Sequence, residues 1–169
     1  MSKVICFWYP VFVGILLGVM QIGLFFQLSL TLSSSFRTFL MVTLAWLIGS
    51  AIGATTLSNR PLKVLLFVML VGYGAVNLLV LSSPYSTGFW FIYALIIVLI
   101  GLYPGAFFGH MGRYYPARIL FFRENNGFII GTVAGTILFA LYGRVILWGL
   151  PVLLALLLLI IPQRVFSSE

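Results

Sequence analysis

Long apolar stretches that carry almost no charge constrain this chain more than any other feature. Of its 169 residues, 63% are hydrophobic and 7% are charged, whereas roughly 25% of the residues of a soluble domain are charged. The only acids are Glu124 and Glu169. So few charged side chains cannot cover the surface of a soluble fold of this size. We therefore expect an all-α protein that folds in a membrane.

Six apolar segments are candidate membrane spans, because roughly 20 helical residues cross the hydrocarbon core. We predict a polytopic integral membrane bundle of about six transmembrane helices, in a single integral membrane domain over residues 1–169, with no internal repeat visible. The first segment is interpreted as a retained span, since no cleavage site of small residues follows it. The expected spans are 8–30, 36–57, 62–81, 89–108, one centred on 127–142, and 145–161.

The last two segments are joined by almost no loop. Only Gly143 and Arg144 separate them, and the stretch 126–161 is too long for one crossing, which favours a tight helical hairpin. Pro116 is well placed to begin the fifth helix, because proline needs no amide partner in the first turn of a helix, and a start at Asn126 is the alternative.

Basic residues predict the orientation of the spans. With six spans and both termini in the cytoplasm, seven basic residues lie inside and two lie outside, as the enrichment of lysine and arginine in cytoplasmic loops requires. The net charge of +7 is scattered singly between apolar segments, which favours the lipid bilayer over nucleic acid as partner. The inside group is Lys3, Arg60, Lys63, Arg113, Arg118, Arg123 and Arg164, and the outside group is Arg37 and Arg144.

Glycines spaced four residues apart recur in four of the segments. This spacing places them on one helix face, and in a membrane such faces let two backbones approach closely. We therefore expect the fourth and fifth helices to pack closely through their glycine faces. The glycines concerned are Gly14 and Gly18; Gly49 and Gly53; Gly101, Gly105 and Gly109; and Gly127, Gly131 and Gly135.

The segment Arg123-Glu124-Asn125-Asn126 is the main candidate for a polar site. If the fifth helix begins at Pro116, this segment lies one to two turns inside it, where polar groups are costly unless they are paired or hydrated. Two interpretations remain open. The segment lines a path for a substrate or a proton, with Glu124 as the proton carrier, or it anchors the helix at the interface through an arginine that reaches the headgroups.

Other polar residues are candidates for smaller roles. Gln21 and Gln27 in the first helix and Asn77 in the third can each form hydrogen bonds between helices or line a polar path, and we favour the hydrogen bonds. Gln21 is in addition a candidate for the path. Arg60 and Lys63 lie in the short basic loop between the second and third helices, where they are expected to cap a helix or to bind lipid headgroups.

Residues for catalysis or metal binding are scarce. His110 is the only histidine and Cys6 the only cysteine, whereas a metal site needs several such ligands and a haem in a membrane normally needs two facing histidines. No nucleophile elbow or phosphate-binding loop is present. We therefore expect no enzyme activity, no catalytic residues, no metal and no cofactor.

Two stretches resemble known membrane proteins. Gly49-Ser-Ala-Ile-Gly53 followed by Ser58-Asn-Arg60-Pro-Leu-Lys63 resembles the loop between helices two and three of the major facilitator fold. That resemblance implies a six-helix, half-facilitator-like architecture in which Arg60 and Lys63 belong to an intracellular gate. The acid that this family carries before the basic residue is missing, because Ser58 and Asn59 stand there.

A second resemblance covers more of the chain. The stretch from Gly14 through Gln21 and Arg37 to Gly53 is similar to the membrane portion of spermidine synthase-like fusion proteins, as is the stretch from Asn126 to Gly135. Gln21 stands where an acid is common in those proteins. We expect no aminopropyl transfer, since the residues after 161 are too few for a synthase domain.

These observations favour an integral membrane transporter-like module for a small solute, which works as an oligomer in the bacterial cytoplasmic (inner) membrane. The alternative is a non-catalytic structural or assembly subunit of a larger membrane complex. The expected partners are the lipid bilayer and either further copies of the chain or other membrane subunits.

Overall fold

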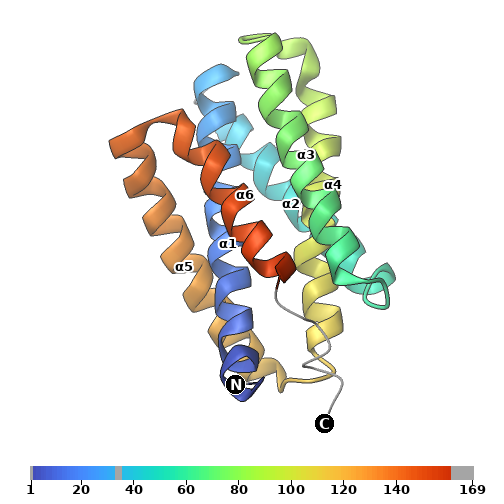
Figure 1. The fold of residues 1–169 in the computed structure, drawn as a ribbon. Helices are drawn as coiled ribbons and strands as arrows, with labels where there is room; N and C mark the ends of the chain where they lie inside the picture. The colour runs from blue at the N-terminus through green and yellow to red at the C-terminus, as the bar shows by residue number, and fades with distance from the viewer. Residues whose placement is uncertain (1, 33–35, 161–169) are drawn as a thin grey trace. The chain divides into compact units, whose positions relative to one another are not determined.

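The computed structural model describes residues 2–32 and 36–160, and every regular element within these ranges is helical (Figure 1). The all-α prediction is therefore confirmed for the described residues. A short 3₁₀ turn, Thr87–Phe89, precedes α4. The helices are α1 (Ser2–Thr31), α2 (Phe36–Thr56), α3 (Leu62–Ser82), α4 (Trp90–Met111), α5 (Ala117–Tyr142) and α6 (Arg144–Ile160).

Five of these helices, α1 to α5, are long and apolar enough to cross a membrane. The sixth, α6, is apolar but has 17 described residues, about 25 Å of helix at 1.5 Å per residue. The predicted end of the sixth span, residue 161, and Arg164 lie outside the described residues.

Proline and glycine set several of the helix boundaries. Pro61 and Pro116 occupy the N-cap positions of α3 and α5. Of the two starts considered for the fifth helix, the structure therefore has the one at Pro116 and not the one at Asn126. Gly143 ends α5 with a φ of 68°, a left-handed conformation that glycine adopts without strain. Its amide donates to the carbonyl of Phe139 at 2.8 Å, and α6 begins at the next residue. The predicted hairpin of α5 and α6 is confirmed.

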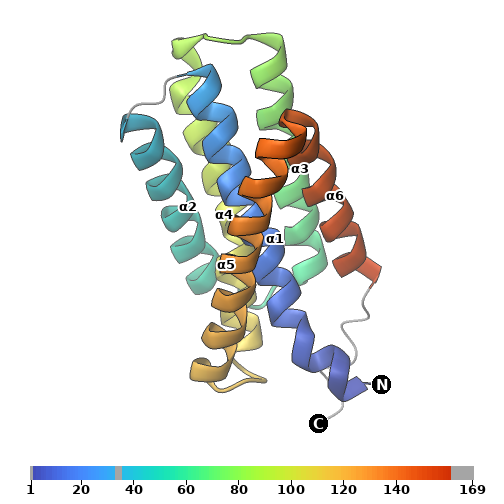
Figure 2. The same ribbon diagram turned by 90° about the vertical axis from the view of Figure 1, so that its left-hand side faces the viewer.

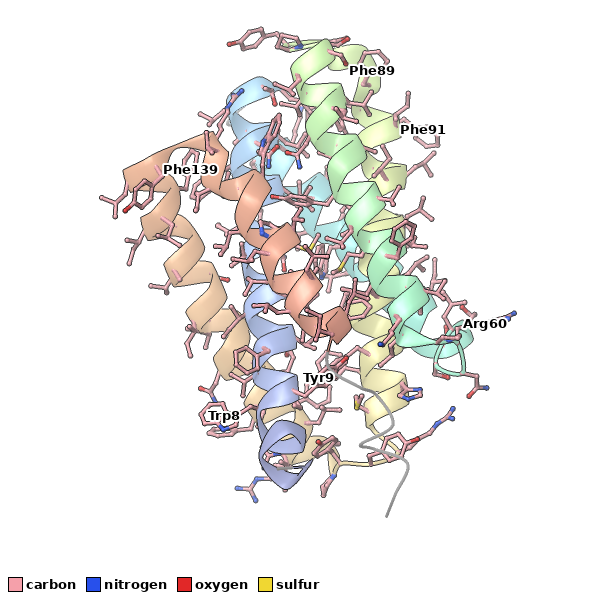
Figure 3. All side chains as sticks on the ribbon, viewed as in Figure 1. Trp8, Tyr9, Arg60, Phe89, Phe91 and Phe139 are labelled. Atoms are coloured by element: carbon pink, nitrogen blue, oxygen red, sulfur yellow. The ribbon has the colours of Figure 1, made fainter. Side chains whose placement is uncertain are left out.

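Internal contacts divide the chain into two compact units. The first contains the described parts of Met1–Met20 and Met111–Glu169, and the second is Gln21–His110. One boundary falls inside α1, so this helix contributes to both units. At its start, α1 presents Trp8 on one side, half-exposed, and Tyr9 on another side, buried (Figure 3).

In the first unit, α1 and α5 run parallel with their main chains in contact (Figure 1). A Cβ atom added to Gly14 would lie 2.8 Å from the main-chain nitrogen of Phe128, and one added to Gly131 would lie 2.8 Å from the Cα of Ile15. Real Cβ atoms do not approach other atoms this closely. Neither position can hold a larger residue unless one helix moves. We call this contact the α1·α5 seam.

In the second unit, α2 and α4 form a contact of the same kind, also parallel (Figure 2). An added Cβ at Gly53 would lie 2.9 Å from the carbonyl carbon of Leu102, and one at Gly105 would lie 2.7 Å from the nitrogen of Ala54. Trp46 packs here too, with 6% of its surface exposed and its carbonyl facing Gly101. We call this contact the α2·α4 seam.

The seams correct the predicted partners of the glycine faces. We expected the faces of the fourth and fifth helices to be packed closely, and they are, but α4 packs on α2 and α5 packs on α1. Glycine spacing specifies which face of a helix is smooth, and it does not specify which neighbour will use that face. Gly109 also belongs to the α2·α4 seam, against Ser58, and Gly135 is buried on the glycine face of α5.

The two seams share one register. Adding 87 to a position in α1 gives its equivalent in α4, and subtracting 78 from a position in α5 gives its equivalent in α2. Each seam thus joins one helix from the first three to one from the last three, which is an internal repeat of packing. The carbonyl–glycine pairs are Val11–Gly127, Ile15–Gly131, Glu124–Gly14 and Phe128–Gly18 in the first seam, and Val98–Gly49, Leu102–Gly53, Trp46–Gly101 and Ser50–Gly105 in the second.

Alanine substitutions test both seams. Gly131→Ala and Gly105→Ala each insert a methyl group into main-chain contacts, and we expect each to lower stability by about 1–3 kcal/mol, measured by thermal unfolding in detergent. Gly74 in α3 is the matched control, because a Cβ there would meet nothing within 4 Å. Gly74→Ala is expected to be neutral, or stabilising by up to about 1 kcal/mol. Seam variants as stable as this control would show that the helices are not in backbone contact.

Candidate functional site

The segment Arg123 to Asn126 lies in the second and third turns of α5, which begins at Ala117. Consecutive residues on a helix point in directions about 100° apart, so the four side chains cannot share one face. Glu124 is buried with 5% of its surface exposed, whereas Asn125 and Asn126 are exposed. The segment therefore presents one acid to the packed side of the helix and two amides to the outside.

Glu124 belongs to the face that forms the α1·α5 seam. The buried residues of α5 are Leu120, Glu124, Gly127, Gly131 and Gly135, which follow the spacing of a single helical face. The carbonyl oxygen of Glu124 is the nearest atom to a Cβ placed on Gly14 of α1. The carboxyl group thus leaves the main chain at a point where two helices touch.

The neighbours of Glu124 along the chain make contacts elsewhere, away from the α1·α5 seam. The guanidinium carbon of Arg123 lies 5.8 Å from the centroid of the Tyr115 ring, a cation–π distance. The side-chain amide of Asn126 donates to the carbonyl of Phe122 at 2.7 Å, within its own helix. Arg118 is exposed, on a different side of α5 from the buried Glu124.

The other candidates for the polar path and the gate lie in the second unit. Gln21 is partly exposed on α1, and Arg60 and Lys63 are exposed around the α2–α3 loop, from which Arg60 projects outward (Figure 3). The end of α4 lies against this loop. Nδ1 of His110 is 3.3 Å from the carbonyl oxygen of Ser58. His110 therefore has a structural contact at the end of its helix.

A buried polar cluster in the second unit joins α1 to α3. The side-chain amide of Gln27 donates to the hydroxyl of Tyr73 at 3.2 Å, which confirms the predicted hydrogen bond between helices for Gln27. Within the described residues Asn77 forms no link to another helix. Its amide donates to the main-chain carbonyl of Tyr73 at 3.0 Å, one turn back in the same helix. The participation of Tyr73 was not predicted, since a tyrosine in an apolar segment gives no signal of its own.

Two acceptors in this cluster have no hydrogen-bond partner within the described part of the chain. They are Oε1 of Gln27 and Oδ1 of Asn77, both fully inaccessible. A buried acceptor without a partner costs about 1–3 kcal/mol. The cluster therefore combines a stabilising link between two helices with two acceptors that can receive a donor.

Comparison with known proteins gives no relative: no family model, no curated protein and no solved structure matches this chain. The geometry of the two units and the chemistry of their polar residues are the basis for any functional assignment.

Removing one hydroxyl tests the Gln27–Tyr73 link. Tyr73→Phe leaves the Gln27 amide donor without its acceptor, and we expect a loss of about 1–3 kcal/mol in stability to thermal unfolding. Tyr142→Phe, at the exposed end of α5, is the matched control and should have no effect. Equal stability of the two variants would mean that the hydrogen bond contributes nothing in the membrane-like environment.

Proposed function

We propose that this chain is an integral membrane transporter-like module for a small solute, which works as an oligomer. The observation that carries the proposal is the shared register of the α1·α5 and α2·α4 seams. Many secondary transporters are built from inverted repeats, and three helices per repeat occur within each half of facilitator proteins. A repeat of three spans enters the membrane from the opposite side in its second copy, and the exchange of α1 with α4 and of α5 with α2 fits that scheme.

The repeat also directs attention to Glu124. Its equivalent in the second seam is Trp46, so the acid is present in one seam only. If a carboxyl group were needed for packing, both seams would require a polar residue at this position. An acid buried at a helix contact inside a membrane is a functional candidate by default. We propose that Glu124 carries a proton or contacts the solute, with access from the cytoplasmic end of α5.

The proposed orientation places both termini in the cytoplasm of a bacterial inner membrane. Within the first unit, α1 and α5 are parallel, so Lys3, Arg113 and Arg118 lie towards one end and Arg144 towards the other. Arg60 and Lys63 flank the α2–α3 turn of the second unit, and the α3–α4 connection around Ser83 carries no charge. This segregation supports the positive-inside assignment.

A topology experiment tests that orientation. A fluorescent reporter that folds only in the cytoplasm, fused after Ser168, is expected to give signal, because six spans return the chain to the side of its N-terminus. A cysteine introduced at Tyr85, in a chain with Cys6 replaced by serine, should react with an impermeant maleimide added outside. A periplasmic C-terminus would mean that α6 does not cross, or that the whole orientation is inverted.

The alternative function, a structural or assembly subunit, is supported by α6. Leu153, Leu156 and Leu157 are exposed on this short apolar helix. Lipid or a neighbouring subunit would cover them. In this case the chain would be recovered from native membranes in a fixed ratio to another membrane protein.

A flux assay separates the two functions. Purified protein in proteoliposomes is tested for uptake of a panel of labelled amino acids, sugars and amines, at several external pH values. We expect uptake by the native protein and loss of its pH dependence in Glu124→Gln. Asn125→Ala, which changes an exposed neighbour, is the matched control. Absence of uptake for the whole panel, together with constant co-purification of one partner, would favour the subunit.

A further inference from the structure

We propose that the segment 113–123, at the start of α5, is a binding site for the headgroup of an anionic phospholipid. It carries three arginines and no acid. Arg113 and Arg118 are exposed, and Arg123 is partly exposed. Glu124, which follows directly, is buried in the seam and leaves the surface of this segment uniformly basic. The inference is independent of whether the chain transports a solute.

The beginning of α5 adds to this positive field. Its N-cap is Pro116, and no side chain caps the helix. The amides of Ile119 and Leu120 donate to the carbonyl of Pro116, which leaves the amides before them at the open end of the helix. The N-terminus of a helix carries a partial positive charge and attracts anions such as phosphate. Arg113 and Arg118 flank this end on both sides in sequence.

The same turns of α5 also present apolar side chains outward. Phe122 is 70% exposed and Phe121 is 51% exposed, and Ile119 is exposed beside them. Large apolar side chains beside arginines match a molecule with an acidic head and a hydrocarbon tail. Free phosphate would use only the arginines, and nucleic acid would leave the phenylalanines in water. Charge and apolar surface together therefore commit the site to a phospholipid.

Arginine suits this role for a further reason. Its planar guanidinium can form two parallel hydrogen bonds to phosphate oxygens, which the lysine ammonium cannot do. Arg123 is held over the ring of Tyr115, so its position is defined before a lipid binds. The α2–α3 loop has an exposed arginine and an exposed lysine, Arg60 and Lys63, beside the exposed Phe67. This loop offers fewer charges and provides a matched control.

Native mass spectrometry tests the site. The full chain in a mild detergent is titrated with palmitoyl-oleoyl phosphatidylglycerol and, separately, with the corresponding phosphatidylcholine. The native protein is expected to retain phosphatidylglycerol in preference to phosphatidylcholine. Each basic residue near a membrane surface contributes about 1 kcal/mol to the attraction of anionic lipid, so Arg113→Gln with Arg118→Gln should weaken phosphatidylglycerol binding by about 30-fold. Arg60→Gln with Lys63→Gln should weaken it less than the arginine pair does, because the α2–α3 loop has one arginine and one lysine and lacks a third basic residue.

Further variants keep the test decisive. Arg113→Lys with Arg118→Lys keeps the charge and should bind more weakly than native but more tightly than the glutamine pair. Thermal unfolding in phosphatidylcholine nanodiscs checks that all variants are folded. Equal losses in the two glutamine pairs would overturn the proposal in favour of general charge attraction. Equal retention of the two lipids would also overturn the proposal. Competition by millimolar inorganic phosphate would overturn it as well, because it would identify a site for free anions.

Discussion

Main chain packed against main chain, at positions where glycine leaves no side chain between two helices, is the contact on which the arrangement of each unit depends. Lipid tails are as apolar as leucine, so burial of apolar side chains gives helices in a membrane little reason to associate. Close approach of backbones supplies dispersion contacts and weak Cα–H···O interactions instead. In both seams a carbonyl oxygen of one helix faces a glycine of the other.

This contact also determines which helices are partners. Both seams are parallel, and consecutive membrane spans run in opposite directions when the loops between them are short. A parallel seam must therefore join helices separated by an even step along the chain, as α2 with α4 and α1 with α5 are. The α5–α6 hairpin, turned by Gly143, is the antiparallel complement in the first unit.

Two buried polar residues lie at contacts between helices: Glu124 at the α1·α5 seam and Gln27 in the cluster that joins α1 to α3. The main chain of Glu124 is held by its contact with Gly14, so this residue cannot leave its place beside α1 without opening the α1·α5 seam. Gln27 is 1% exposed and uses one of its two polar ends to bind Tyr73. Motion of either helix pair would change the environment of one of these groups, which is the coupling that the proposed transport function needs.

Helix positions follow from the sequence with good accuracy, because each depends on local chemistry. The charge-poor stretches predict α2 (Phe36–Thr56) and α3 (Leu62–Ser82) almost to the residue. The start of α5 at Pro116 follows from the missing amide hydrogen of proline. The turn at Gly143 follows from the conformational freedom of glycine. These features need no knowledge of the neighbouring helices.

The sequence does not predict which helices pack against each other, nor which side chains of a helix are buried. The glycine spacing of α4 and α5 predicts smooth faces but not that α2 and α1 occupy them. The packing repeat is not visible in the sequence for two reasons. The equivalent positions are 87 residues apart for α1 and α4 but 78 apart for α2 and α5, and the equivalent helices share little beyond small residues. Asn77 illustrates a second limit, since its amide finds an acceptor in its own helix. The composition of the segment from Arg123 to Asn126 likewise cannot show that only Glu124 is buried.

Pulsed electron–electron double resonance, which measures the distance between two spin labels, tests the central claim, the parallel α1·α5 seam, most directly. In a chain with Cys6 replaced by serine, one label is placed at the exposed Trp8 and the second either at Phe121 or at Tyr142, both exposed on α5. A parallel seam with Val11 beside Gly127 places Trp8 level with position 124 of α5. It therefore predicts a short distance for the pair Trp8 and Phe121, and a distance of at least about 27 Å for the pair Trp8 and Tyr142. The reverse order, or equal distances for the two pairs, would contradict the account.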